Sequence, residues 1–114
     1  MFFYSKKFRL IYSKDFNHVL NRPIWKKNDK GLFIISRINS HCFPRLGLMI
    51  SKKNVKKAHQ RNTIKRLIRE YFRLNYYRFQ KMDFIVLVKI RFKIFDKKTF
   101  LKELRNLWKY YHLS

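Results

Sequence analysis

The segment from Gly47 to Asn75 constrains the fold more than any other stretch, because its pattern is that of a strand, a turn and a helix with two unlike faces. Residues of an α-helix advance by about 100° each. On that wheel the large apolar side chains fall within an arc of about 140°, wide enough for a core-facing stripe. These side chains are Ile64, Leu67, Ile68, Tyr71 and Phe72. The segment predicts a helix at about Gln60–Tyr76 that packs on a sheet.

The flank of this predicted helix carries a row of cations. Four of them follow one another at i, i+4 spacing and two polar residues widen the row: Arg61, Lys65, Arg69 and Arg73, with Asn62 and Arg66. Glu70 is the single acid in the segment, so the Glu–Lys pairs that stabilise an ordinary exposed helix are missing. Such a row is either a solvated face or a surface for a polyanion, and the scarcity of acids favours the polyanion.

The overall charge supports the same interpretation. The chain has 114 residues, with 29 Lys and Arg against 6 Asp and Glu, and a formal net charge of +23. A compact domain with this charge repels itself, and a polyanion relieves the repulsion. Nucleic acid is therefore the leading partner class, and an anionic membrane surface is the second. The length allows one domain, residues 1–114.

Several short motifs occur together in this chain. The central ones are Ser51-Lys52-Lys53, Ala58 and Arg61-Asn62-x-x-Lys65-Arg66-x-x-Arg69-Glu70; the others are Arg9-Leu10, Asp15-Phe16, Val19, Arg45-x-Gly47-Leu48 and Met82-Asp83-Phe84. Together they resemble the signature of the bacterial ribonuclease P protein subunit over roughly Phe8 to His112. Two positions depart from that pattern: Thr63 replaces a second arginine, and Leu20 replaces an aromatic residue.

The resemblance implies an α+β fold, an α/β sandwich like domain 2 of ribosomal protein S5. This fold has a four-stranded mixed sheet packed by three to four helices, with a left-handed βαβ crossover through the basic helix. The general rule for such crossovers predicts the opposite hand. The fourth strand, near Trp25 or after Gly31, is implied by the resemblance alone.

The residues themselves predict three strands. The first two, at Leu32–Ile38 and Arg45–Ser51, are expected to form an antiparallel pair because their connection is short. The third, Phe84–Ile90, is an apolar run typical of a strand buried on both faces. Gly47 indicates a bulge or a close backbone approach.

Two further helices are predicted. Ser13 is expected to cap a helix from Lys14 to about Leu20, and Asp96 a helix from Lys97 to about Tyr111. A short helical turn is expected at 54–59, and residues 1–7 are expected to be weakly held.

The sequence offers no catalytic constellation. The acids are scattered singly, and His18, His41, His59 and His112 lie far apart. With two glycines, the chain has no phosphate-cradling loop. Cys42 is the single cysteine, which excludes a disulfide within the chain, and no metal-ligand companion lies near it. The longest apolar run is too short to span a bilayer and no signal peptide is evident, so a cytoplasmic protein is expected.

The resemblance also implies a function. In that family the catalyst is an RNA, and the protein is a non-catalytic subunit that assists removal of the 5′ leader from precursor tRNA. The implied partners are the catalytic RNA and the single-stranded leader, with no membrane and no required protein partner. Mg²⁺ would be held mainly by the RNA. The alternative is a structural RNA-binding protein, resembling a ribosomal protein, without a part in catalysis; a basic membrane binder is a weaker third reading.

Site residues follow from the resemblance, position by position. Those implied to bind RNA are Arg61, Asn62, Lys65, Arg66, Arg69, Arg73, Lys52 and Lys53. Those implied to line a cleft for the leader are Phe16, Leu20, Phe33 and Ile34, and Lys52 and Lys53 are implied to line the same cleft. Phe16 fits a core position equally well, because an apolar stripe at helical spacing is usually core.

Overall fold

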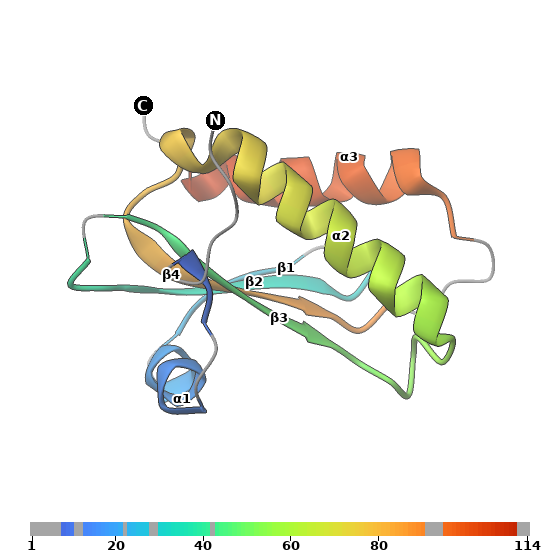
Figure 1. Ribbon diagram of the computed structural model, residues 1–114, viewed down its shortest axis with the longest axis horizontal. Helices are drawn as coiled ribbons and strands as arrows, with labels where there is room; N and C mark the ends of the chain where they lie inside the picture. The colour runs from blue at the N-terminus through green and yellow to red at the C-terminus, as the bar shows by residue number, and fades with distance from the viewer. Residues whose placement is uncertain are drawn as a thin grey trace.

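The computed structural model describes residues 8–10, 13–21, 23–27, 30–41, 43–90 and 95–111. The elements are α1 (Ser13–Asn21), β1 (Ile24–Lys27), β2 (Leu32–Ile38), β3 (Arg45–Ile50), α2 (Ala58–Asn75), β4 (Met82–Val88) and α3 (Lys97–Trp108), with short 3₁₀ helices η2 (Tyr76–Arg78) and η3 (Lys109–Tyr111). Helices α2 and α3 cover one face of a mixed sheet, and α1 lies on the other (Figure 1). The expectations for residues 1–7 and for Cys42 concern positions outside the described residues.

The strand order is β1-β2-β4-β3, which places β4 in the middle. Strand β2 is antiparallel to β1 and to β4, whereas β3 is parallel to β4. The predicted pairing of β2 with β3 is therefore wrong. The physical reason is that β4 needs cover on both faces and neighbours on both edges, and a parallel β3–β4 pair needs the long crossover that α2 supplies.

Strand β4 is the most buried element of the sheet. Six of its seven residues are buried, and Leu87 is partly buried. The prediction of a strand covered on both faces is confirmed, with its start two residues earlier than expected. The fourth strand is β1, which contains Trp25.

The sheet separates two apolar cores. The larger core lies under α2 and α3, and there the rings of Phe79 and Trp108 stack with their centroids 4.5 Å apart. The smaller core lies under α1 and contains Leu10, Val19 and Ile35. Complete burial of side chains of this size stabilises the fold by about 1.5–3 kcal/mol each, which fixes both helix layers on the sheet.

The predicted helices are confirmed to within a few residues. Helix α2 starts two residues early, at Ala58. The helical turn expected at 54–59 is wrong: the hydrogen-bonded turn lies earlier, at 51–55, where the Ser51 carbonyl accepts the N–H of Val55, and residues 58 and 59 already belong to α2. Asp96 caps α3 by accepting the N–H of Lys98 at 3.1 Å. The last residues of that predicted helix form η3 instead of α-helix.

Candidate nucleic-acid interface

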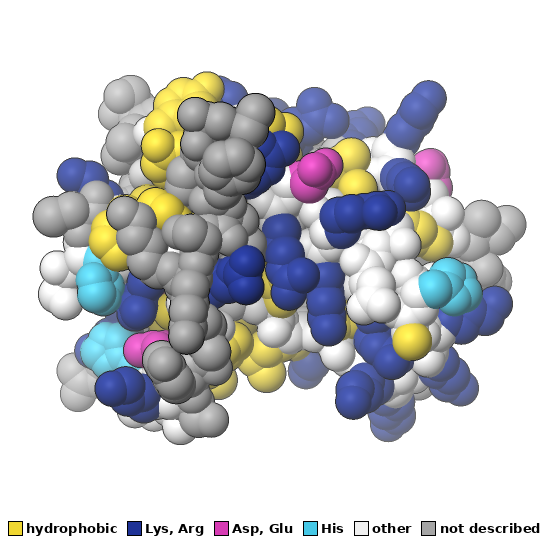
Figure 2. Space-filling model, in the orientation of Figure 1, with side chains coloured by type: hydrophobic (Ala, Val, Ile, Leu, Met, Phe, Trp, Pro, Cys, Tyr) yellow, Lys and Arg dark blue, Asp and Glu magenta, His cyan; other side chains and the backbone are white. Residues whose placement is uncertain are grey.

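Helix α2 is anchored by its apolar stripe. Ile64, Ile68 and Phe72 are fully buried, and Leu67 and Tyr71 pack against the same core. This burial holds the helix in one rotation and turns its basic flank away from the sheet. Figure 2 shows Lys and Arg side chains gathered over α2 and the turn that precedes it.

The row of cations on α2 is not uniform. Arg66 and Arg69 are exposed, and Asn62 is exposed beside them. At the end of the row, Arg73 lies 3.8 Å from the carboxylate of Glu70. The middle of the helix therefore presents the cations best placed to meet an external anion.

Arg61 is bound to the protein's own backbone. Its Nη1 donates to the carbonyls of Val55 and Lys56, both at 2.8 Å. These two bonds tie the first turn of α2 to the basic turn that follows β3. Lys52 and Lys53 are exposed in that turn, so Arg61 helps to fix the segment that carries them.

Thr63, which replaces an arginine of the family pattern, makes an internal bond. Its Oγ1 donates to the carbonyl of His59 at 2.9 Å. This is the usual i−4 bond of a threonine within a helix. The hydroxyl therefore stays with the helix backbone.

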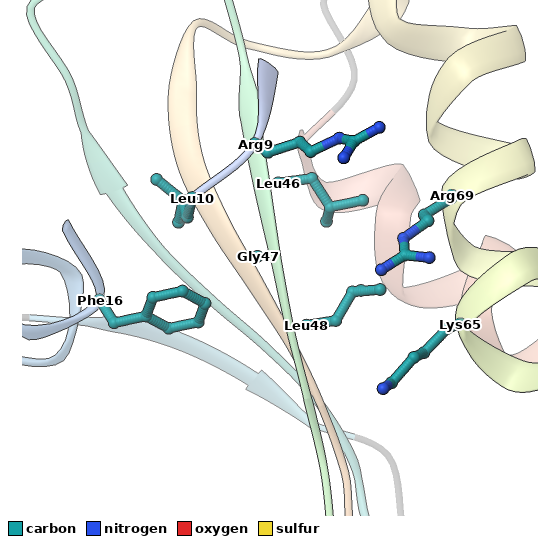
Figure 3. A pocket seen from close by; sticks show the side chains of 8 residues that line it. All are labelled: Arg9, Leu10, Phe16, Leu46, Gly47, Leu48, Lys65 and Arg69. Atoms are coloured by element: carbon teal, nitrogen blue, oxygen red, sulfur yellow. The ribbon is translucent and has the colours of Figure 1, made fainter. Parts of the chain in front are cut away.

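A groove of about 290 Å³ wraps around the edge of β3. It is lined by Arg9, Leu10, Phe16, Leu46, Gly47, Leu48, Lys65 and Arg69. Figure 3 shows Phe16 and Leu10 on one side of β3, and Arg9, Lys65 and Arg69 on the other. One aromatic ring and three cations thus flank the same edge strand.

Gly47 makes room for the ring of Phe16. A Cβ at this position would lie 2.7 Å from the tip of that ring and 3.0 Å from the Cβ of Leu10. Contacts under 3.0 Å are not tolerated without movement, so the backbone of β3 can approach α1 only where a side chain is missing. The expected close approach at Gly47 is confirmed, and the β3–β4 register runs through it without interruption.

The structure separates the predicted cleft residues. Phe16 lines the groove and also packs on the smaller core, together with Leu20. Phe33 is partly buried on the α1 face of β2 and does not line the groove. Lys52 and Lys53 are not among the lining residues either.

Ile34 requires a correction, because it cannot line a cleft. Its side chain is fully buried in the larger core, under α2 and α3. Successive side chains of a strand point to opposite faces, so Phe33 and Ile34 cannot share a surface. The alternation already present in the sequence could have excluded one of the two.

Arg9 and Leu10 were missed as site residues. Arg9 forms an isolated parallel bridge with Leu46, and the N–H of Leu10 donates to the Leu46 carbonyl at 3.0 Å. This short pairing places the Arg9 side chain near Lys65 and Arg69. The only signal in the sequence was the Arg9-Leu10 motif, to which no role was attached.

A buried ion cluster supports the α1 side of the groove. Asp83 is 1% exposed, and its carboxylate accepts from Arg45 Nε and Nη2, both at 2.7 Å. Asn39 Nδ2 donates to the same carboxylate at 2.8 Å, and Arg45 also lies 3.8 Å from Asp15 of α1. The hydrogen bond to Asp83 raises the pKa of Arg45, opposed by the desolvation of its guanidinium. Arg45 therefore stays charged and joins α1 to β4.

Two kinds of feature are missing from the described ranges. No helix in them is long and apolar enough to cross a membrane. No group of three or more His, Cys, Asp or Glu side chains within the same ranges could hold a metal ion.

Comparison with known proteins assigns the family. The family model for ribonuclease P matches residues 4–112. The chain is 45% identical to the ribonuclease P protein component of Buchnera aphidicola subsp. Baizongia pistaciae over 111 residues, which covers 97% of this chain and 96% of that protein. Its fold is similar to that of the Staphylococcus aureus RNase P protein, with a TM-score of 0.81 at 26% identity over 90% of this chain and 94% of that one. For the Thermotoga maritima RNase P protein the TM-score is 0.75 at 29% identity, over 92% and 98%. The chain therefore belongs to the ribonuclease P protein component family, and so to an endoribonuclease that acts in tRNA processing.

Proposed function

We propose that this protein binds the catalytic RNA of ribonuclease P and the single-stranded 5′ leader of precursor tRNA, and so assists removal of the leader. The observation that carries this proposal is the groove at the β3 edge, where Phe16 lies opposite Lys65 and Arg69. An aromatic face beside a cluster of cations is the usual arrangement for unpaired nucleotides. The RNA carries the chemistry in this proposal, and the protein supplies binding and position.

The exposed part of α2 meets the phosphates of the catalytic RNA. Arg66 and Arg69 supply the charge there, and Asn62 can hydrogen-bond a phosphate or a sugar. Such contacts fix the position of an RNA without reading its sequence. Arg61 contributes through the turn that it holds, because its Nη1 is already bound to two carbonyls.

The groove receives the leader. A base stacks on Phe16, while Arg9, Lys65 and Arg69 neutralise neighbouring phosphates. Stacking contributes about 1–3 kcal/mol per base and accepts any base, which suits an enzyme that processes many leaders.

The proposed function also concerns Mg²⁺, the cellular compartment and the handedness of the connection between β3 and β4. Mg²⁺ ions that activate the attacking water are held mainly by the RNA, and the protein lowers the magnesium requirement by reducing repulsion between two RNAs. The protein acts in the cytoplasm. The left-handed sense of the β3–α2–β4 connection stays a prediction.

A reconstitution experiment tests the proposal. The protein is mixed with a ribonuclease P RNA and a precursor tRNA at low magnesium, and leader cleavage is followed. We expect cleavage that depends on the protein and falls by about tenfold or more in the double variant Arg66→Ala, Arg69→Ala. Lys98→Ala together with Lys102→Ala, two exposed lysines of α3, serves as a control of equal charge.

The same experiment distinguishes the proposed function from the alternative, a structural RNA-binding protein without a part in catalysis. A structural RNA-binding protein would bind the RNA with the same salt dependence, yet it would leave leader cleavage at the level of the RNA alone. In binding titrations, the slope of log K against log salt should lie at about −5 to −9 for about 6–10 phosphate contacts. A much shallower slope would mean that α2 does not contact the phosphates of the RNA.

A further inference from the structure

A second exposed surface lies at the far end of α2. Tyr77 is 67% exposed, Tyr110 is 62% exposed and Leu74 is 58% exposed. Four exposed cations belong to the same segments: Arg78, Lys81, Arg105 and Lys109. We call this set of seven residues the tyrosine patch. Figure 2 shows hydrophobic side chains gathered at this end of the molecule, with Lys and Arg side chains beside them.

The segments of the tyrosine patch are held together by contacts in the folded protein. The N–H of Gln80, just after η2, donates to the carbonyl of Tyr111 in η3 at 2.8 Å. Beneath them, the rings of Phe79 and Trp108 stack 4.5 Å apart. Figure 1 shows the C-terminal ends of α2 and α3 at the same end of the molecule. The patch therefore has a rigid base, although its two tyrosines come from different parts of the chain.

The charges of the tyrosine patch have one sign. The sequence has no acid from Tyr71 to Lys81 and none from Leu104 to Tyr111. Burial raises the pKa of the Tyr71 phenol, and Arg78 and Arg105 both lie close enough to offset part of this shift. An anionic partner therefore meets four cations and no repelling carboxylate within these segments.

We propose that the tyrosine patch is a second binding surface for single-stranded RNA, distinct from the groove at the β3 edge. Tyr77 and Tyr110 supply the faces on which unpaired bases stack, and the four cations supply contacts to the phosphates. Along the helix axis Tyr77 is roughly 18 Å from Lys65, so one protein can hold two unpaired segments at once. A second copy of the chain fits poorly, because each copy carries a charge of +23.

Binding to an unstructured oligouridine of about 12 nucleotides tests this proposal. The assay is fluorescence anisotropy in two backgrounds, the wild type and the groove variant Phe16→Ala, Arg69→Ala. In the groove variant, the remaining affinity should fall about fivefold or more on Tyr77→Ala and should change by less than about twofold on Tyr77→Phe, which keeps the ring. Because the groove is already disabled in that background, failure of the patch and failure of the proposed leader site give different results.

Variants that remove a single charge give a second, independent test of the tyrosine patch. Lys109→Gln should reduce the slope of log K against log salt by about one, whereas Lys98→Gln, at the opposite end of α3, should change it less. Circular dichroism should show that the variants at Tyr77, Lys98 and Lys109 remain folded, because these three positions are exposed. The proposal is overturned if Tyr77→Ala binds oligouridine like its parent in both backgrounds. It is also overturned if sedimentation shows a dimer that Tyr77→Ala dissociates, because the patch would then bind a second copy.

Discussion

Arg45 and Asp83 form a bidentate ion pair that joins the edge strand β3 to the central strand β4, with both N–O distances at 2.7 Å. The strand register places Arg37 of β2 opposite the same aspartate. Helix α1 lies across this row, because Arg45 approaches Asp15 and Arg37 donates to the carbonyl of His18 at 3.1 Å. Two cations from the strands that flank β4 thus hold α1, and with it the ring of Phe16.

Loss of the Arg45 guanidinium should destabilise the protein strongly. Arg45→Ala leaves the carboxylate of Asp83 buried, with the side-chain amide of Asn39 still donating to it, and breaking a pair of this kind costs about 3 kcal/mol. The measurement is the free energy of unfolding in urea. Arg73→Ala, which removes an outer contact to Glu70, should cost less than about 1 kcal/mol. Equal losses for the two variants would mean that the Asp83 pair is no stronger than a surface contact.

Asp15→Asn should weaken binding of the leader more than it lowers the free energy of unfolding. Asp15→Asn weakens the contact between α1 and Arg45 at 3.8 Å, so the free energy of unfolding should fall by less than about 1 kcal/mol. The ring of Phe16 is then held less firmly, and the Kd for leader-bearing precursor tRNA should rise about threefold while that for mature tRNA stays constant. Glu103→Gln, which removes the contact of α3 to Lys30, is the control. If both RNAs lose affinity equally, Asp15 does not act through the groove.

Arg61 and Arg66 should behave differently despite their equal charge. Arg61→Ala removes two charge-assisted bonds to the carbonyls of Val55 and Lys56, and should lower the free energy of unfolding by about 1.5–3 kcal/mol. Arg66→Ala should change stability by less than about 0.5 kcal/mol, yet reduce the salt slope of RNA binding by about one. The measurements are the free energy of unfolding in urea and the salt dependence of RNA binding, for both variants. The reverse pattern would make Arg61 the direct phosphate contact.

Gly47 and Phe16 should be energetically coupled. Gly47→Ala forces a Cβ to within 2.7 Å of the Phe16 ring and should destabilise the protein by about 1–3 kcal/mol. In a Phe16→Ala background most of this cost should disappear, giving a coupling energy of about 1 kcal/mol or more in a double-mutant cycle. Gly31→Ala is a matched control, because its cost comes from a φ of +96° and should not depend on Phe16. Additive effects of Gly47→Ala and Phe16→Ala would contradict the close approach.

Tyr111 should make the protein sensitive to alkali. Burial raises the pKa of this phenol above its ordinary value of 10.0, and the nearby Ser36 hydroxyl offsets part of the shift. The folded state therefore keeps the neutral phenol at a pH where the unfolded chain already ionises it, so stability present below about pH 10 is lost as the pH rises through the folded pKa. Tyr111→Phe should reduce this loss, as measured by Tm across that range. Parallel Tm curves for the two proteins would exclude Tyr111 as the cause.

The local elements of this fold could be predicted from the sequence, and the strand order could not. The stripe around Ile64 and the cap at Asp96 depend on residues a few positions apart, so periodicity and side-chain chemistry are sufficient to find them. The place of β4 between β2 and β3 depends on contacts between distant parts of the chain. The short loop after Ile38 favours pairing of β2 with β3. That rule considers only neighbouring segments, whereas β4, which comes much later in the chain, lies between the two strands.

The site was predictable to a similar degree. The cations of α2 and the ring of Phe16 follow from helical spacing and from the family motifs. Their meeting in one groove depends on the β3 edge, on the absence of a side chain at Gly47 and on a single bridge from Arg9. The partner of Asp83 was also hidden, although an acid in an apolar strand requires a buried counter-charge.

The insertion of β4 between two earlier strands has a consequence for synthesis on the ribosome. A nascent chain that ends before Met82 contains the whole basic helix but lacks the middle of its sheet, so β2 and β3 have no strand to join them. Folding must then wait for the last third of the polypeptide, and until that point a strongly cationic, unfolded segment emerges beside ribosomal RNA. We therefore expect the nascent chain to stay exposed to nonspecific contacts until β4 has left the ribosome and completed the sheet.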